Sequence, residues 1–354
     1  MKIPFFIQEF TQEMENAVLD TLRNEQFVGG ESVSKFEDEF AKYIGTKYAV
    51  SVSSGNGALH LSLFALGLSD NSKIITPTNS FIASANCIRM INAKPILCDI
   101  HYEDGNIDMN SVNDSADAII PVHIYGNPCD FDSVRIFAEE HKIPIIEDAC
   151  QAHGAEYKNK KVGSISDVGC FSFYPTKNMT VGGDGGMVTT NNEELAKKIA
   201  SMRDNGRKSK NEFDKLGFTM RLNTVNAAIG RIQLKHLNEK NQRRREIASV
   251  YRKKLHEDCI IPENIDGKSV YHQIVLKHKK RDEIRNELTG SEIGCAIHYE
   301  TPIHLQPYYS NEEYTLPNSE QFAKEILSLP SYPSLTNDQI HLICEHVNKV
   351  IRKA

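Results

Sequence analysis

The fold is decided by residues 118–148, which read AIIPVHIYGNPCDFDSVRIFAEEHKIPIIED. Residues 118–122 form an apolar run that predicts a strand, and residues 143–148 form a second one. Between them, residues 132–141 carry apolar side chains at helical spacing. A strand, a helix and a strand in succession are typical of an α/β fold with a parallel sheet.

The same alternation continues on both sides of this stretch, from about residue 32 to residue 200. Helices are expected at residues 33–43 and 58–66, each followed closely by a glycine that favours a helix stop. Short strands are expected at residues 48–52, 73–76 and 95–98. These elements predict a mostly parallel sheet covered by helices on both faces. In such sheets ligands gather at the carboxyl ends of the strands, so functional residues are expected there.

Beyond residue 200 the pattern changes. Residues 225–255 carry apolar side chains at helical spacing and predict one long helix. Shorter elements follow, namely a strand at residues 274–276 and helices at residues 321–327 and 337–351. We therefore predict a large domain with an N-terminal arm over residues 1–240, and a smaller C-terminal α/β domain over residues 241–354.

The composition argues against several classes of protein. The 354 residues carry a formal net charge of -6, whereas a protein that binds nucleic acid without sequence preference needs a basic excess. No apolar run approaches the length of a membrane span, and the apolar stretch at the start is too short for a signal peptide. The eight cysteines form no C-x-x-C pair, which suits reduced thiols. We expect a soluble, cytoplasmic protein that binds neither nucleic acid nor membrane.

One basic run stands out, at Arg243, Arg244 and Arg245. Ile247 and Tyr251 follow at helical spacing, so the run lies in the predicted long helix. A charged run in such a place is usually a solvated helix face, and we expect one here.

Residues 53–57 (SSGNG) follow a predicted strand and precede a predicted helix. Small residues there let backbone N–H groups approach an anion, and the N-terminus of the helix favours negative charge. The loop lacks the Lys-Ser/Thr pair of a nucleoside-triphosphate P-loop, so a single phosphate fits better. A plain turn with a helix cap explains the same residues at least as well.

Two charged residues follow strands farther along the chain. Asp148 ends the strand predicted at residues 143–148. An acid in this position can cap a helix, bind a metal or pair with a cationic ring nitrogen. Taken alone, the position favours the helix cap. Lys177 follows an apolar, aromatic-rich segment, which predicts a partly desolvated ammonium with a lowered pKa and an amine free for carbonyl chemistry. An exposed surface lysine is the alternative. The glycine-rich residues 182–186 permit a tight turn near this lysine.

Together these features point to pyridoxal phosphate (PLP). The cofactor needs an anchor for its phosphate, a carboxylate that keeps its pyridine nitrogen protonated, and a lysine that holds its aldehyde and moves protons. The loop at residues 53–57, Asp148 and Lys177 supply all three on one α/β sheet.

The sequence also resembles the DegT family of sugar aminotransferases, PLP enzymes of the aspartate-aminotransferase fold (fold type I), along nearly its whole length. The matching stretches are VSKFEDEFAKY (33–43), YAVSVSSGNGALHL (48–61), PVHIYGNP (121–128), IEDACQAHGA (146–155), FSFYPTKNMTVGGDGG (171–186), AAIGRIQL (227–234), IHYETPIHLQP (297–307) and LSLPSYP (327–333). Each stretch alone is a weak signal, but so many in order over one chain are specific.

The resemblance implies a role for individual positions in a large PLP-binding domain. Lys177 matches the Schiff-base lysine, and Asp148 matches the partner of the pyridine nitrogen. Gln151 matches the residue beside the phenolic oxygen of the ring, and Phe81 matches the aromatic that stacks on the ring face. The positions that match the phosphate-binding set are Gly55, Asn56, Ser172 and Thr219.

Two of these positions depart from the family pattern. Asn56 stands where the family usually has Thr, which keeps a backbone donor but changes the side-chain contact. Thr219 stands where the family usually has an Asn that reaches the phosphate from the neighbouring subunit. Its hydroxyl is shorter, so we expect a weaker or water-mediated contact there.

The resemblance implies ping-pong transamination through a Lys177 Schiff base. An amino donor, expected to be glutamate, passes its amino group to the cofactor, which then aminates a keto group of a nucleotide-linked sugar. The active site of this fold lies at a subunit interface, so a homodimer is expected. A PLP-dependent sugar dehydratase is disfavoured, because that branch of the family has His in place of the lysine. The alternative from another class is a PLP-binding regulatory protein without turnover.

Four further residues lie in segments that border the substrate by resemblance, without assigned contacts: Arg207, Arg221, His298 and Tyr299. His298 and His304 flank Pro302, but the sequence has no His-Glu-x-x-His motif or Cys/His cluster, so no metal site is expected. Substrate contact or plain packing is expected for the two histidines.

Overall fold

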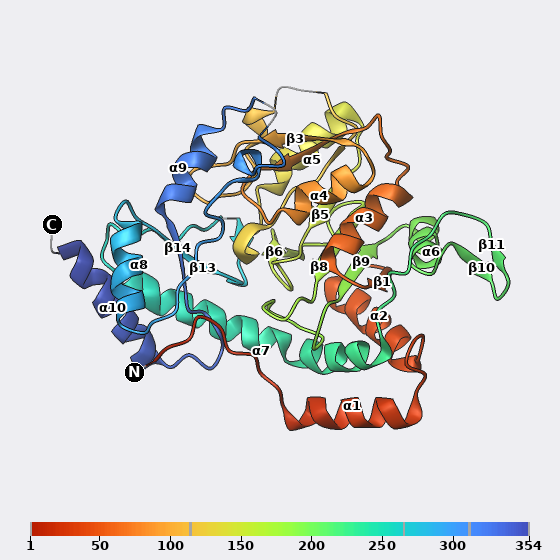
Figure 1. Cartoon of the computed structure of the whole chain (residues 1–354), viewed down its shortest axis with the longest axis horizontal. Coiled ribbons are helices and arrows are strands. Elements are labelled where there is room, and N and C mark those ends of the chain that lie inside the picture. The colour runs from red at the N-terminus through yellow and green to blue at the C-terminus, as the bar shows by residue number, and fades with distance from the viewer. Residues whose placement is uncertain (1, 113–114, 265, 311–312, 353–354) are drawn as a thin grey trace.

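The helices and strands follow the predicted alternation, in a computed structural model that describes residues 2–112, 115–264, 266–310 and 313–352 (Figure 1). The helices are α1 (Gln12–Asn24), α2 (Glu31–Ile44), α3 (Gly55–Ala65), α4 (Ala83–Met90), α5 (Phe131–His141), α6 (Glu193–Met202), α7 (Thr224–Lys254), α8 (Arg281–Gly290), α9 (Pro317–Glu325) and α10 (Asn337–Arg352). The strands are β1 (Tyr48–Val52), β2 (Lys73–Pro77), β3 (Lys94–Cys98), β4 (Ala118–Ile119), β5 (Ile146–Asp148), β6 (Glu156–Tyr157), β7 (Lys160–Lys161), β8 (Val168–Ser172), β9 (Gly186–Thr190), β10 (Arg207–Ser209), β11 (Glu212–Phe213), β12 (Gly267–Lys268), β13 (Ile274–Lys277) and β14 (Ile326–Leu329).

The central sheet has the strand order β1-β9-β8-β5-β4-β2-β3. Its two parts, β1-β9-β8-β5 and β4-β2-β3, are joined by parallel bridges from Ile119 to Ile145 and from Val122 to Asp148. β9 runs antiparallel to both of its neighbours, whereas β2 with β3, β2 with β4, and β5 with β8 pair in parallel. The prediction of a mostly parallel sheet is therefore confirmed. The carboxyl ends of β5 and β8 lie side by side, because Asp148 is paired with Cys170.

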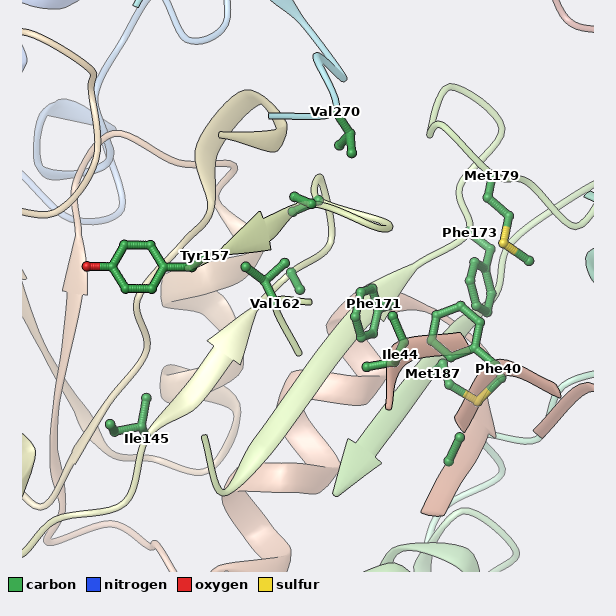
Figure 2. Packing of buried hydrophobic residues seen from close by; sticks show 14 of the residues in the cluster. Phe40, Ile44, Ile145, Tyr157, Val162, Phe171, Phe173, Met179, Met187 and Val270 are labelled. Carbon is green, nitrogen blue, oxygen red and sulfur yellow. The ribbon is translucent and has the colours of Figure 1, made fainter. Parts of the chain in front are cut away.

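Apolar side chains cover both faces of this sheet. Along β8, Cys170 packs among residues of α3, α4 and α6, whereas the next residue, Phe171, points to the opposite face. There the Phe171 ring packs edge-to-face on the ring of Phe40 from α2, with ring centroids 5.0 Å apart. The Phe173 ring lies 5.5 Å from the Phe40 ring (Figure 2). Helices α2, α5 and α7 cover that face. Burial on both faces holds the strand ends rigidly in place.

The long helix α7 connects two hydrophobic cores. Its first half packs on α1 and α2 beside the sheet, as Figure 1 shows, and its second half packs on α10. Ile247 and Tyr251 belong to the second core, which β13, β14, α8 and α10 share with Ile3 from the start of the chain. The domain boundary at residue 240 stays a prediction, since α7 runs through that position without a break. None of the helices in the described part of the chain combines the length and apolar character that a bilayer-crossing segment needs.

Two expectations are wrong in this C-terminal region. The helix expected at residues 321–327 begins earlier and ends at Glu325, and Ile326–Leu329 forms β14, paired antiparallel with β13. Ile326 and Leu327 are buried in different cores on opposite faces of that strand, which a helix could not achieve. Arg244 is not on a solvated face, because it is only 5% exposed. It precedes Ile247 by three residues and Tyr251 by seven, so the helical repeat places it on the buried side.

Candidate functional site

A cavity of about 590 Å³ opens at the carboxyl ends of β1, β5 and β8. Seven of the eight residues assigned to the site by resemblance line it: Gly55, Asn56, Phe81, Asp148, Gln151, Ser172 and Lys177. They come from segments up to 122 positions apart in the sequence, counted from Gly55 to Lys177. The sheet topology brings them together as expected for such folds.

The loop after β1 forms a close-fitting seat at the start of α3. Ser54 caps this helix, because its hydroxyl accepts a hydrogen bond from the Gly57 N–H at 3.0 Å. A Cβ on Gly55 would lie 2.6 Å from the Ser172 Cβ and 2.8 Å from the Cys150 Sγ, so only glycine fits. The Asn56 Oδ1 is buried without a partner among the described residues, so this acceptor is open only to a ligand group that donates a hydrogen bond. N–H groups at a helix start in a tight seat favour an anion.

Asp148 presents a fixed carboxylate to the cavity. It is 5% exposed, and its Oδ2 accepts a hydrogen bond from the Ser84 hydroxyl at 2.7 Å, while its Oδ1 accepts one from the Cys150 N–H at 3.2 Å. Turns, not a helix, follow this strand directly, so the helix-cap interpretation of Asp148 does not apply. A buried carboxylate without an ion pair among the described residues suits a cationic ligand.

The neighbouring acid, Glu147, has a different use. Its carboxylate lies within 3.0 Å of the His123 Nε2, and it accepts hydrogen bonds from the N–H groups of Gly163 and Ile165 and from the Ser166 hydroxyl. These contacts are buried on the far side of the strand, because adjacent strand residues point to opposite faces. Asp148 is therefore the acid of this pair that a ligand in the cavity can reach.

Lys177 enters the cavity from the turn that follows β8. Its backbone N–H donates to the Tyr174 carbonyl at 2.8 Å, which fixes the turn. Desolvation lowers the pKa of the Lys177 ammonium, opposed by the nearby Cys150 and Asp148. The lowered pKa increases the share of free amine at neutral pH, the form that attacks a carbonyl.

Two further side chains frame the space between Asp148 and Lys177. Phe81 is 55% exposed at the cavity wall, so the ring has a face free for stacking. Gln151 is buried and held at both ends, because its Oε1 accepts from the Tyr125 N–H at 2.8 Å and its Nε2 donates to the Tyr299 hydroxyl at 3.3 Å. The Tyr299 ring lies 6.1 Å from the Phe81 ring. Tyr299 thus lines the cavity. The sequence had not decided its contacts.

Three residues that the resemblance placed near the ligands lie away from this cavity. Thr219 is exposed, and its hydroxyl donates to the Asn205 Oδ1 at 3.1 Å. Arg207 and Arg221 both form ion pairs with Asp204. This cluster lies where β10 and β11 project from the body of the molecule (Figure 1). None of the three is among the residues that line the cavity, although the Met220 carbonyl accepts a hydrogen bond from the Ser53 N–H beside the phosphate loop.

Several cavity residues carry no signal in the sequence. Ser84 comes from α4, where nothing in its surroundings marks it as the partner of Asp148. His272 is buried. Its pKa lies well below the usual range, mainly because of burial and also because Lys177 and Arg244 are nearby, so the ring is neutral.

Of the two histidines around Pro302, His298 lines the cavity, whereas the His304 Nδ1 lies buried 2.8 Å from the Thr78 hydroxyl.

Comparisons with known proteins agree with this geometry. The model of the DegT/DnrJ/EryC1/StrS aminotransferase family matches residues 8–348. A dTDP-3-amino-3,4,6-trideoxy-alpha-D-glucose transaminase from Streptomyces venezuelae is 35% identical, over 98% of this chain and 96% of that protein. A pleiotropic regulatory protein from Geobacillus stearothermophilus is also 35% identical, with the same two coverages. The crystal structure of S. venezuelae DesV in complex with a ketimine intermediate superposes with a TM-score of 0.95, 35% identity and 98% coverage of both chains.

Proposed function

The chain belongs to the DegT/DnrJ/EryC1/StrS aminotransferase family, and from this premise we propose that it uses PLP to transfer an amino group to a keto group of a nucleotide-linked sugar. The observation that carries the proposal is the meeting of Asp148 and Lys177 in one cavity with the seat at Gly55. Glutamate is proposed as the amino donor. The free cysteines, most of them buried, support a cytoplasmic location.

The residues of the cavity fit PLP. The start of α3 at Gly55 and Asn56, together with the Ser172 hydroxyl, would hold the phosphate. Asp148 would hold the pyridine nitrogen, and Phe81 and Gln151 would hold the ring face and its phenolic oxygen. When bound, PLP supplies an aldehyde that captures an amine and a ring that accepts electrons.

The chain's own groups then orient the reactants and move protons. The Asp148 carboxylate, fixed by Ser84, would keep the ring nitrogen of a bound cofactor protonated, because a buried negative charge favours the cationic form of its partner. The Lys177 Nζ, which lines the cavity, would be the group that accepts a proton from the donor's α-carbon and returns it during the transfer. Desolvation suits Lys177 to this work, since an amine with a lowered pKa accepts and releases protons readily near neutral pH.

Adding glutamate to the PLP-loaded protein is expected to bleach the visible absorption band of the bound cofactor, and adding 2-oxoglutarate is expected to restore it. The reason is that the first half-reaction passes the amino group to the cofactor without the sugar. Glutarate, which has both carboxylates but no amine, is the control and should leave the band in place. Absorption spectra recorded during each titration make the measurement.

The same spectra decide between this proposal and a regulatory protein, the second candidate that the name of the Geobacillus relative favours. A band that glutamate leaves unchanged would favour a PLP-binding regulator without turnover. A protein that takes up no PLP would overturn both ideas. Mass spectrometry of a nucleotide ketosugar treated with the glutamate-reduced protein separates an aminotransferase, which adds an amino group, from a dehydratase, which removes water.

We also propose a homodimer, because the N-terminal arm, α1 and the residues after it leave large apolar side chains uncovered. Phe10 is 62% exposed on the N-terminal arm, Leu22 of α1 is 46% exposed, and Phe27 after α1 is 66% exposed. Several exposed apolar groups of this size on one segment of the chain are typical of an interaction surface. Thr219 is exposed, hydrogen-bonded to Asn205 and outside the cavity of its own chain, so a second copy can approach it.

Light scattering is expected to give twice the mass of one chain. A Phe10→Glu, Phe27→Glu double variant should shift the protein toward the monomer, because a charge cannot be buried at a dry interface without a partner. Lys160→Glu, on the exposed strand β7, is the matched control for an added negative charge. A single-chain mass for the unaltered protein at high concentration would contradict the dimer.

A further inference from the structure

Tyr125 has a backbone conformation that large side chains rarely adopt. Its φ is 61° and its ψ is 7°, in the left-handed region that favours glycine. The residue lies between β4 and α5 and is 4% exposed, so this conformation is found in the interior and not in a surface turn. A backbone of this kind persists only where the surrounding contacts hold it, and such residues concentrate at functional sites. The contacts of Tyr125 therefore indicate its role.

Three polar groups of Tyr125 each contact a residue of the main cavity. Its backbone N–H donates to the Gln151 Oε1 at 2.8 Å, and its carbonyl accepts from the Gln273 N–H at 3.2 Å. Its hydroxyl donates to the His298 carbonyl at 2.5 Å, and burial raises the pKa of this hydroxyl, so it stays a donor. Gln151, Gln273 and His298 line the cavity, whereas Tyr125 lies behind its wall. One buried residue thus connects three separate segments of that wall.

The Tyr125 N–H determines the orientation of the Gln151 amide. An N–H can only donate, so the end of the amide that faces it must be the oxygen. The Nε2 then faces the other way with two hydrogens, one of which goes to the Tyr299 hydroxyl at 3.3 Å. The second hydrogen remains for a ligand in the cavity. Turned round, the buried amide would place its NH₂ group against the Tyr125 N–H, where two donors cannot bond to each other.

The left-handed conformation continues through Gly126, whose φ is 84°. A Cβ there would lie 2.8 Å from the Val270 Cγ2 and 2.9 Å from the Gln151 carbonyl oxygen, so only glycine fits. The Val270 N–H donates to the Gly126 carbonyl at 3.0 Å and anchors the turn on this side. With that side fixed, the chain can relieve the positive φ of Tyr125 only by rotating the peptide that precedes it. This rotation would turn the Tyr125 N–H away from Gln151.

We propose that Tyr125 is a positioning residue for the bound cofactor, whose left-handed backbone keeps the Gln151 Nε2 directed at the phenolic oxygen of PLP. The proposal rests on the proposed function and adds a residue that does not itself line the cavity. The Tyr125 ring packs in a core with Val275 and Phe322, and its hydroxyl bond to His298 adds a fixed point, so together they hold the strained backbone.

The orientation of the Gln151 amide can be read from the pH dependence of the visible absorption band of the PLP-loaded protein. The phenolic oxygen of PLP and the nitrogen that its aldehyde captures share one proton. A hydrogen bond donated to the oxygen favours the form that has lost this proton, so it lowers the midpoint of the transition, and loss of the donor raises it. The charged residues of the cavity wall, Asp148, Lys177 and Asp184, stay the same in every variant below.

The test is a pH titration of this band, which needs no turnover. Gln151→Ala removes the donor and is expected to raise the midpoint by about one to two pH units, the range for losing a hydrogen bond to a charged group. Tyr125→Ala should raise it by about one pH unit, the lower end of that range. The reason is that alanine has neither the ring nor the hydroxyl that holds the backbone, and a left-handed conformation is unfavourable for it.

Tyr125→Gly separates the backbone from the side chain. Glycine adopts a positive φ without strain, so this variant also loses the ring but should move the midpoint less than half as far as Tyr125→Ala. A role in packing alone predicts the opposite order, because glycine leaves the larger hole. Tyr157→Ala is the matched control, since Tyr157 is also 4% exposed, donates its hydroxyl to Asp130 at 3.0 Å and does not line the cavity. It should lower thermal stability without moving the midpoint.

A double variant shows whether Tyr125 acts through Gln151. Tyr125→Ala combined with Gln151→Ala is expected to have the midpoint of Gln151→Ala alone, because the second change finds no amide left to orient. Additive shifts, or a shift in Tyr125→Gly as large as in Tyr125→Ala, overturn the inference.

Tyr125→Phe guards against a folding defect. If Tyr125→Ala loses its thermal transition, Tyr125→Phe takes its place, because it fills the same space and loses only the hydroxyl bond to His298. It is expected to raise the midpoint by about half a pH unit, the lower end for a neutral hydrogen bond. An unchanged midpoint in this folded variant contradicts the positioning role.

Hydrogen exchange tests the same contact in the protein without PLP. The Tyr125 amide is expected to exchange about 10-fold faster in Gln151→Ala than in the unaltered protein, the factor for losing one hydrogen bond, as followed by mass spectrometry. Equal exchange in the two proteins contradicts the contact. Midpoints that shift as expected in a protein that glutamate does not bleach overturn the proposed transamination and leave the positioning role supported.

Discussion

Replacing Lys177 with alanine is expected to remove the visible absorption band of the PLP-loaded protein and to lower the turnover number by about 10²- to 10⁴-fold or more, the contribution of a positioned proton-transfer group. Lys177 is the lysine that lines the cavity between the Gly55 seat and Asp148. No other amine described there can take over the capture of the aldehyde or the movement of the proton. Absorption spectra and a coupled assay for 2-oxoglutarate release give the two readings.

The matched control is Lys160→Ala, a change of the same size on the exposed strand β7. It should leave both the band and the turnover number unchanged. Thermal unfolding should show that Lys177→Ala still folds, because the residue is only partly buried and its backbone makes the contact to Tyr174. Turnover at the level of the unaltered protein in Lys177→Ala would falsify the mechanism.

Asp148→Asn is expected to lower the turnover number by about 10²- to 10³-fold, the range for removing one preorganised electrostatic contact from a reacting centre. The amide has nearly the same shape as the carboxylate but carries no charge, so it cannot keep a pyridine nitrogen protonated. We expect PLP still to bind, because the phosphate seat at Gly55 and Asn56 is untouched. A shifted absorption band together with slow bleaching by glutamate is the expected signature.

Ser84→Ala separates the charge of Asp148 from its position. The Ser84 hydroxyl donates to Oδ2, so its loss frees the carboxylate without neutralising it, and the rate should fall far less than in Asp148→Asn. Glu147→Gln is a poor control, because its buried contacts to Gly163 and Ser166 would be disturbed. An Asp148→Asn protein as fast as the unaltered one would remove the carboxylate from the mechanism.

The sheet and the main cavity follow from signals that are local in the sequence. Apolar runs such as residues 118–122 and 143–148 predict strands by themselves, and polar or charged residues directly after them must gather at one edge of a parallel sheet. Residue type and position made Lys177 and Asp148 candidates, but a surface lysine and a helix cap remained open for them until the features were taken together. The lining of the cavity by Phe81, Gln151 and Ser172 was expected only from the resemblance.

Other features depend on contacts that the sequence does not contain. Ser84 meets Asp148 across 64 positions of the chain, so no local pattern marks it. Residues 326–329 have helical and strand character alike, and pairing with β13 decided between them. Arg244 stood in a run of three arginines, which obscured that only its position shares a helical face with Ile247 and Tyr251.

The unbroken helix α7 couples the two ends of the molecule mechanically. Inserting one residue near its middle would turn everything beyond that point by about 100° and move it by about 1.5 Å. Arg244 would then point away from Lys177, while the loops elsewhere could absorb insertions at little cost. We therefore expect insertions and deletions to be tolerated less in helix α7 than in the loops as the chain evolves.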